Sequence, residues 1–167
     1  SLGNDRLPVT AYITWSLIDA GFGAEDAARR GLDYVREFQS QANDPYVAAL
    51  VANALVAGDQ AAGGELSSAA RSALERLAGL AVREGQFVYW KSAVATFVGG
   101  EGQTGSIETT ALAAFAFLRA GEQPDLANAA LGFLVREKDS FGTWHSTQAT
   151  VLALKALTAM PEVHDKL

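Results

Sequence analysis

Few side chains in this sequence are of the types that carry chemistry, and their spacing assembles none of them into a site. The 167 residues include no cysteine, which excludes a disulfide, a thiolate zinc site and a cysteine nucleophile within the chain. The two histidines, His145 and His164, share no helical face, and neither has an identifiable partner to orient it as a general base. We therefore expect no catalytic residue, no metal site and no cofactor.

A glycine-rich segment resembles a nucleotide-binding fingerprint. Residues 100–105 (GEGQTG) match the pattern G-x-G-x-x-G, and Asp125 follows twenty residues after the last glycine. That motif functions within a strand–helix–strand unit, which places the pyrophosphate at the N-terminus of the helix. Here the sequence predicts one helix followed by another, so we expect a glycine loop and no bound dinucleotide.

The remaining polar and aromatic candidates have structural interpretations. Glu108, in the first turn of an apolar segment, suits the positive end of a helix dipole, and no second carboxylate is identifiable beside it. Lys155 lies on an apolar segment, where it is expected to form an ion pair or extend its ammonium to water. Five aromatic residues at helical spacing are expected to pack in the core and not to line a substrate cavity. They are Trp15, Phe115, Phe117, Phe133 and Trp144.

The composition excludes several other classes. A net charge of −6, with no cluster of lysine and arginine, gives no reason to expect nucleic acid as a partner. No apolar run approaches the ~18 residues of a membrane span. A hydrophobic content of 49% predicts one well-filled globular core.

The elements that must position any functional residue are revealed by an internal repeat. Residues 10–40 align without a gap to residues 110–140, with nine of the 31 positions identical. After a shift of two residues the match resumes, so that Leu50 pairs with Leu152. Self-similarity on this scale indicates one supersecondary unit stacked several times.

Two kinds of helix alternate along the repeat. Four segments are apolar nearly all round and must be covered on both sides: 10–20, 46–57, 107–120 and 147–159. Three segments between them are amphipathic, with one apolar face each: 24–39, 66–84 and 124–138. Prolines and glycines mark their ends; Pro124 fits a first turn, Gly21, Gly58 and Gly121 fit C-caps, and Pro161 closes the last helix.

This alternation predicts inner helices covered by outer ones. The predicted fold class is all-α, an α/α toroid of about seven long helices, formed by residues 1–167 as one domain. An open solenoid of helical hairpins is the alternative, although its repeats usually span ~34–47 residues. Residues 85–106 break the helical rhythm, and Phe87–Trp90 could pair with Ala95–Val98 as a short β-hairpin near 86–98.

Two stretches carry a family resemblance. Residues 106–118 (SIETTALAAFAFL) and 141–157 (FGTWHSTQATVLALKAL) closely resemble the late part of the thioester domain of alpha-2-macroglobulins and complement thioester proteins. The segments 9–17 and 46–58 also look like helices of that family, so the resemblance runs along nearly all of 7–160. The matching motif residues, expected to be structural, are Glu108, Thr109, Gly142, Trp144, Ser146, Thr147 and Gln148.

The resemblance implies a helical domain of a large secreted or periplasmic protease-trapping protein, with a fold like that of terpenoid cyclases. In that family a protease cuts a bait region, the molecule rearranges, and a Cys–Gln thioester acylates a nearby nucleophile. The implied partners are the other domains of the same protein and, through the whole molecule, proteases. The implied location is extracellular or periplasmic, and the composition leans bacterial.

This chain departs from the family in one respect. It has no thioester cysteine, and His145 does not stand at the position of the family's assisting histidine, so no catalytic residue carries over. We expect a piece of a longer protein that forms only part of a ring. A partial ring leaves apolar surface exposed near 10–20 or 147–159, through which the chain could self-associate.

Two other functions stay open from the sequence. An enzyme of the terpene-cyclase or prenyltransferase kind can use the same toroid, but the sequence contains no D-x-D-D or D-D-x-x-D cluster and no cysteine for zinc. A helical scaffold that binds a peptide along its concave face is the other alternative.

Overall fold

The computed structural model describes residues 5–93, 102–139, 142–144 and 146–159. Within them lie seven α-helices and one two-stranded antiparallel sheet, which confirms an all-α protein with a small hairpin. The helices are α1 (Arg6–Leu17), α2 (Asp26–Phe38), α3 (Pro45–Ala61), α4 (Ser68–Gly79), α5 (Gly102–Ala120), α6 (Pro124–Glu137) and α7 (Thr147–Thr158). The strands are β1 (Val82–Glu84) and β2 (Phe87–Tyr89).

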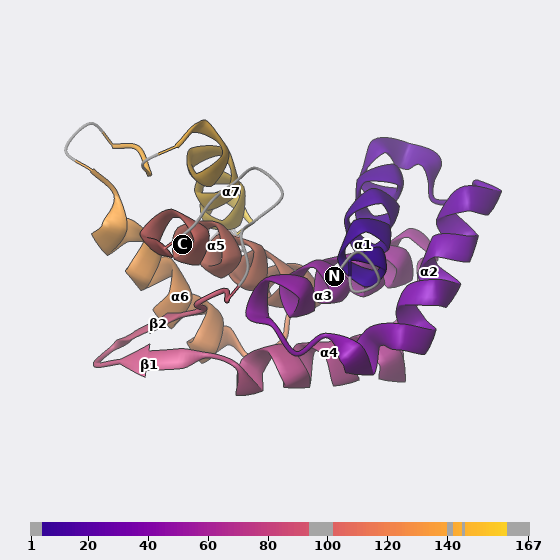
Figure 1. Ribbon diagram of the computed structural model, residues 1–167, viewed down its shortest axis with the longest axis horizontal. Coiled ribbons are helices and arrows are strands. Elements are labelled where there is room, and N and C mark those ends of the chain that lie inside the picture. Colours follow the sequence, from indigo (N-terminus) through magenta and orange to yellow (C-terminus); the bar gives the residue numbers. More distant parts are fainter. Residues whose placement is uncertain (1–4, 94–101, 140–141, 145, 160–167) are drawn as a thin grey trace, which may run out of the picture.

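The helices form two layers. Helices α1, α3, α5 and α7 pack side by side in that order, and α2, α4 and α6 each pack mainly on the odd-numbered helix before them. Figure 1 shows α2, α4 and α6 around the outer edge, while α1 and α7 stand at opposite ends of the arc. The described helices therefore form an open arc of inner and outer helices, and its closure into a ring stays a prediction.

Burial separates the two central inner helices from the two end helices. In α3, 13 of 17 residues are buried, and in α5, 12 of 19 are buried. The corresponding numbers are five of 12 in α1 and three of 12 in α7. The prediction of nearly complete cover is confirmed for α3 and α5, whereas α1 and α7 are covered on one side only.

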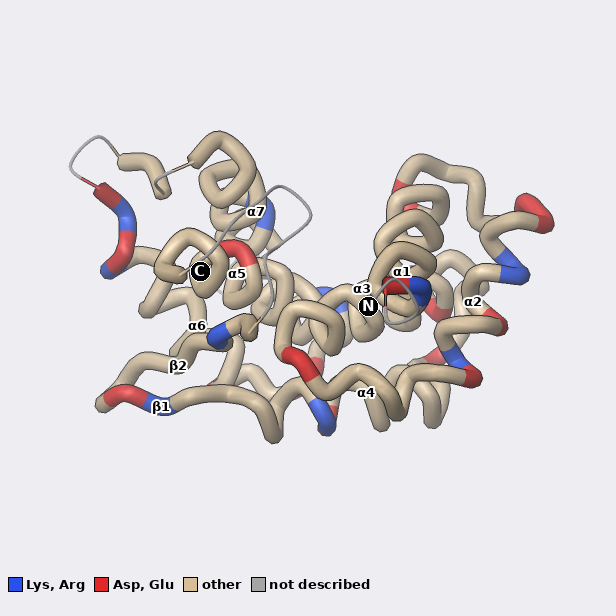
Figure 2. The backbone as a smooth tube through the Cα atoms, viewed as in Figure 1, with Lys and Arg blue, Asp and Glu red and all other residues tan. Residues whose placement is uncertain are grey.

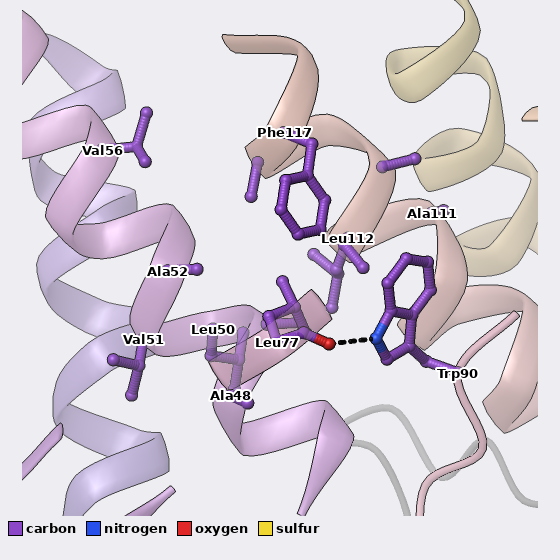
Figure 3. Packing of buried hydrophobic residues seen from close by; sticks show 14 of the residues in the cluster. Ala48, Leu50, Val51, Ala52, Val56, Leu77, Trp90, Ala111, Leu112 and Phe117 are labelled. Atoms are coloured by element: carbon purple, nitrogen blue, oxygen red, sulfur yellow. Dashed lines mark hydrogen bonds between the residues drawn. The ribbon is translucent and has the colours of Figure 1, made fainter. Parts of the chain in front are cut away.

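The core lies between the two layers at the centre of the arc. Three side chains lie together there in Figure 3, and each is 0% exposed: Leu77 of α4, Phe117 of α5, and Trp90, which follows β2. The rings of Trp90 and Phe117 are stacked with centroids 6.1 Å apart. Full burial of a large apolar side chain stabilises a fold by about 1.5–3 kcal/mol, so this cluster fixes how the layers meet.

Short polar side chains begin three of the helices. Asp44 accepts hydrogen bonds from the Tyr46 and Val47 amides at the start of α3 (2.9 and 3.3 Å). Ser67 and Ser146 cap α4 and α7 in the same way. Gly21 follows α1 within a π-helical turn (Ile18–Phe22), and Gly121 follows α5; both have positive φ, as predicted for C-cap glycines.

Several predictions differ from the structure. Helix α5 begins at Gly102 and not near Ile107, so residues 102–105 are helical and do not form the predicted glycine loop. Glu108 therefore lies beyond the first turn of α5 and is buried, and the prediction that it sits in a first turn at the helix dipole is wrong.

Gly58 is not a C-cap, because α3 continues to Ala61 and Gly58 packs against Leu32, whose Cδ2 would lie 2.8 Å from an added Cβ. Helix α4 ends at Gly79, so the predicted helix over 66–84 is too long. Its last residues, Val82–Glu84, form β1 and pair with Phe87–Tyr89. The predicted strand at Phe87–Trp90 is thus present as β2, and its pairing with Val82–Glu84 is a contact that the sequence prediction missed. Its predicted partner Ala95–Val98 lies outside the described residues, as does Pro161.

Charged residues lie mainly away from the central inner helices. Figure 2 shows many of them along α2, on the β1–β2 hairpin and at the end of α6. Among the described helices, none has the length and apolar character needed to cross a membrane.

Candidate functional site

The motif residues predicted from the sequence lie on α5, in the connection between α6 and α7, and at the start of α7. Glu108 and Thr109 belong to α5 and are 2% and 0% exposed. Gly142 and Trp144 lie in the connection between α6 and α7, where Gly142 has φ +78°. Ser146 is the N-cap of α7, and Thr147 and Gln148 form its first turn. Their significance as family motifs stays a prediction, but their local contacts are structural.

Trp144 anchors the connection between α6 and α7. Its indole Nε1–H donates to the Leu134 carbonyl oxygen near the end of α6 (2.6 Å), and its backbone N–H donates to the Thr150 hydroxyl in α7 (3.0 Å). Before it, Asp139 accepts from the Thr143 amide at 2.9 Å and from the Thr143 hydroxyl. The loop is thus tied to the helix before it and the helix after it.

Trp90 makes the same pair of hydrogen bonds one unit earlier. Its indole Nε1–H donates to the Leu77 carbonyl oxygen of α4 (2.7 Å), drawn in Figure 3. Its backbone N–H donates to the Thr110 hydroxyl in α5 (3.0 Å). Each tryptophan therefore joins an outer helix to the next inner helix, and we call this arrangement the tryptophan anchor.

Sequence reasoning identified Trp144 as a motif residue but missed the anchor. Trp90 was assigned only to a hairpin, although Thr110 and Thr150 hold matching positions on α5 and α7. A tryptophan that precedes each of these threonines is the signal that could have revealed it. The five predicted core aromatics do pack as expected: Trp15, Phe117, Phe133 and Trp144 are at most 6% exposed, and Phe115 packs against the core while partly exposed.

A polar cluster joins the C-terminal ends of three inner helices. Arg119 of α5 donates through one terminal nitrogen to both carboxylate oxygens of Asp19 (3.0 and 3.1 Å). Its Nε–H donates to the Gln60 Oε1 of α3 (3.0 Å), while the Gln60 amide donates to the Arg119 carbonyl oxygen (2.8 Å). The side chains of Arg119 and Asp19 are 20% and 27% exposed, so water only partly screens this ion pair.

Lys155 brings the fourth inner helix into the cluster. Its Nζ lies 3.8 Å from Asp19 Oδ2, and 4.9 and 4.8 Å from the ring centroids of Trp15 and Phe115. A cation at that distance from an aromatic face is attracted to the ring quadrupole. The prediction that Lys155 forms an ion pair is confirmed.

The contacts described above are structural ties between helices. Within the part of the chain that the structure describes, no three or more His, Asp and Glu side chains are grouped to hold a metal ion. His145 and His164 lie outside the described residues, as do Gly100 and Glu101. The remaining glycines of that motif open α5, and the described strands are antiparallel, which is not the strand–helix–strand arrangement of a nucleotide site.

Two faces of the arc are open. On α1, Val9, Tyr12 and Ile13 are 40–52% exposed, and on α7, Val151 and Leu154 are 52% and 49% exposed. This confirms the expectation of apolar surface at the two ends. A groove of about 420 Å³ lies between α1 and α2, and its lining residues define what we call the α1/α2 groove. They are Arg6, Val9, Thr10, Ile13, Thr14, Leu17, Ala27, Arg30, Gly31 and Tyr34.

Comparison with known proteins gives one consistent result. A protein-family model described as "A-macroglobulin TED domain" matches residues 2–160. Ovostatin from Gallus gallus is 30% identical over 170 residues, which cover 93% of this chain. The chain spans 11% of the length of ovostatin.

Proposed function

Because the chain belongs to the A-macroglobulin thioester-domain (TED) family, we propose that it acts as a non-catalytic helical domain of a larger endopeptidase inhibitor. Members of this family inhibit proteases and are not enzymes. The observation that carries the proposal is the family match over residues 2–160. The chain contains no cysteine, so it supplies no thioester sulfur of its own.

In the proposed mechanism, a protease cuts a bait region elsewhere in the parent protein. The parent then rearranges around the protease and blocks its access to large substrates. The chain described here contributes a rigid helical body and its open faces contact other domains of the same protein. Members of the family are generally secreted; an extracellular or periplasmic location is part of this proposal.

The internal repeat supports completion of the arc by further helices of the parent protein. A shift of 100 residues carries each of the ten residues that line the α1/α2 groove onto α5 or α6, and every one of those ten counterparts is buried. The counterparts are Ser106, Thr109, Thr110, Ala113, Ala114, Phe117, Ala127, Ala130, Leu131 and Leu134. Trp90, which precedes α5 in the chain, covers two of them: it donates to Thr110 and stacks on Phe117. This supports the proposal that α1 and α2 present a surface shaped for an equivalent unit.

The open face of α7 supports the same conclusion from the other end. A shift of 102 residues carries Val151 and Leu154 onto Ala49 and Ala52 of α3, which are each 0% exposed. Helix α3 packs there against α5, and Asn53 donates to the Leu112 carbonyl oxygen at 3.0 Å. We propose that units of the same kind continue the arc past α7 and before α1, giving an α/α toroid.

The test is a substrate-size assay on the full-length parent protein. A protease mixed with the parent is assayed against a small chromogenic peptide and against a large protein. Trapping predicts that cleavage of the peptide persists while cleavage of the large protein falls at least tenfold. Equal loss of both activities, or no loss of either, would contradict trapping. Incorporation of labelled methylamine then separates covalent trapping from trapping by shape change alone.

A further inference from the structure

Helix α1 carries the threonine of a third tryptophan anchor, without the tryptophan. Inner helices α5 and α7 each present a threonine hydroxyl, on Thr110 and Thr150, that accepts the backbone N–H of a tryptophan. The residue of α1 that the repeat aligns with Thr110 is Thr10. Thr10 lines the α1/α2 groove and has no side-chain hydrogen bond with any described residue. An acceptor of the same type thus stands in the same place without its donor.

The surface beside Thr10 also matches the surface that holds Trp90. Trp90 stacks on Phe117, and the repeat aligns Phe117 with Leu17, an apolar residue of the α1/α2 groove. Val9 and Ile13 extend this apolar surface and are 41% and 52% exposed. A groove of about 420 Å³ has room for an indole ring. Both elements of the anchor that an inner helix can supply, a hydroxyl acceptor and an apolar wall, are therefore present.

We propose that the α1/α2 groove binds a tryptophan carried on an extended segment of the parent protein, whose backbone N–H donates to the Thr10 hydroxyl. The identity of that segment as part of the parent rests on the proposed function; the recognition chemistry does not. The indole would cover Leu17 and Ile13, as Trp90 covers Phe117. Its ring N–H would donate to a carbonyl of the outer helix that precedes α1 in the parent, as Trp90 does to Leu77.

Charge on the groove adds a preference for the bound segment. Arg6 and Arg30 flank it, and the Arg6 guanidinium lies 5.0 Å from the centroid of the Tyr34 ring. Arg6 has no ion pair with a described residue, whereas Arg30 pairs with Asp26 at 3.3 Å. The Arg6 guanidinium, which contacts a ring and no described carboxylate, favours a segment that brings carbonyl or carboxylate oxygens next to its tryptophan.

The experiment uses the present chain and the probe N-acetyl-L-tryptophanamide, which carries both a backbone N–H and an indole. Titration of the ¹⁵N-labelled protein is expected to give saturable chemical-shift changes centred on Thr10, Ile13 and Gly31, with millimolar affinity because the outer helix is missing. Thr10→Val should weaken binding about fivefold, as expected for one lost hydrogen bond. Thr10→Ser, which keeps the hydroxyl, should bind as the original chain does.

Three results would overturn the proposal. They are shift changes that do not saturate, saturable changes centred away from the groove, and equal binding by the Thr10→Val and Thr10→Ser variants. N-acetyl-L-leucinamide tests the need for an aromatic ring and should bind at least fivefold more weakly. None of these readouts depends on protease trapping, so a negative substrate-size assay with positive groove binding would contradict the proposed function alone.

Discussion

Asp19 and Arg119 hold the same position in the two copies of the internal repeat, and their side chains form an ion pair with each other. The distance between Arg119 Nη1 and Asp19 Oδ1 is 3.0 Å. Opposite charges at equivalent positions thus meet where the C-terminal ends of the inner helices converge. The repeat explains the meeting, because equivalent residues of stacked units lie at the same level of the arc.

We predict that this ion pair stabilises the arc. Arg119→Met removes the guanidinium from both Asp19 and Gln60, and should lower the free energy of unfolding by about 1–2 kcal/mol, a range that allows for partial screening by water. Urea denaturation measures the change. Arg30→Met is the control, because its pair with Asp26 is 76–81% exposed and should contribute less than about 0.5 kcal/mol.

The double exchange Asp19→Arg with Arg119→Asp sharpens this test. If the two charges act mainly on each other, the exchanged protein should recover part of the stability lost in either single variant. If the exchanged protein is no more stable than either single variant, then Gln60 and Lys155, and not the ion pair, account for the loss of stability in Arg119→Met.

The tryptophan anchors should have measurable and similar strength. Trp90→Phe and Trp144→Phe each remove a buried indole N–H that donates to a helix carbonyl, which should lower stability by about 0.5–1.5 kcal/mol. The Leu77 carbonyl keeps the hydrogen bond from the Leu80 amide in the Trp90 variant (3.1 Å). Trp15→Phe is the matched control. Its ring is also buried, at 6% exposed, but its Nε1 has no hydrogen-bond partner in the described structure. If all three losses are equal, packing and not hydrogen bonding explains the anchors.

Close packing of α1 on α2 should make Gly31 intolerant of a side chain. A Cβ at Gly31 would collide with the Thr14 hydroxyl oxygen, and the Thr14 side chain is buried at 1% exposure. Gly31→Ala should therefore destabilise the chain by about 1–3 kcal/mol. Gly79→Ala, with nothing within 4 Å of the added Cβ, should be neutral or stabilising. Thermal unfolding compares the two, and partial rescue of Gly31→Ala by Thr14→Ala would place the clash.

The open faces should make the isolated chain self-associate. Sedimentation at increasing concentration is expected to show species larger than a monomer, because apolar faces on α1 and α7 are uncovered. Ile13→Glu and Val151→Glu should reduce this association while changing monomer stability by less than about 0.5 kcal/mol, since both residues are half exposed. A monomer at every concentration would contradict the prediction.

The sequence predicted the two-layer pattern because a helix that is buried on both sides is apolar on nearly every face, and this composition is visible in the sequence. Helices α3 and α5 are the clearest cases. It failed at Val82–Glu84, since the same Val-Arg-Glu triplet occurs within helices at 35–37 and 135–137, and local pattern does not distinguish a helix end from a strand. Gly58 was misread for a related reason: its small size serves the approach of Leu32 and not a turn.

Several side-chain contacts between helices were beyond sequence reasoning. Asp59 accepts from both the backbone and the hydroxyl of Ser67 (2.8 and 2.9 Å), and nothing in the residues around either one announces it. The Asp19–Arg119 pair had a signal, namely opposite charges at aligned positions. Using this signal to predict the ion pair required the assumption that aligned residues of the two repeats lie in contact. Only the curvature of the arc in the structure shows that they do.

The tryptophan anchor forms with connecting segments of different length between the tryptophan and the threonine. Twenty residues separate Trp90 from Thr110, but only six separate Trp144 from Thr150, and the hydrogen bonds are equally short. Because the chain is pinned at both sides of its crossing, whole segments can be added or deleted there without shifting a helix. Related proteins should accordingly differ most in length in the segment between the anchor tryptophan and the inner helix. New binding loops can evolve in that segment without changing how the helices pack.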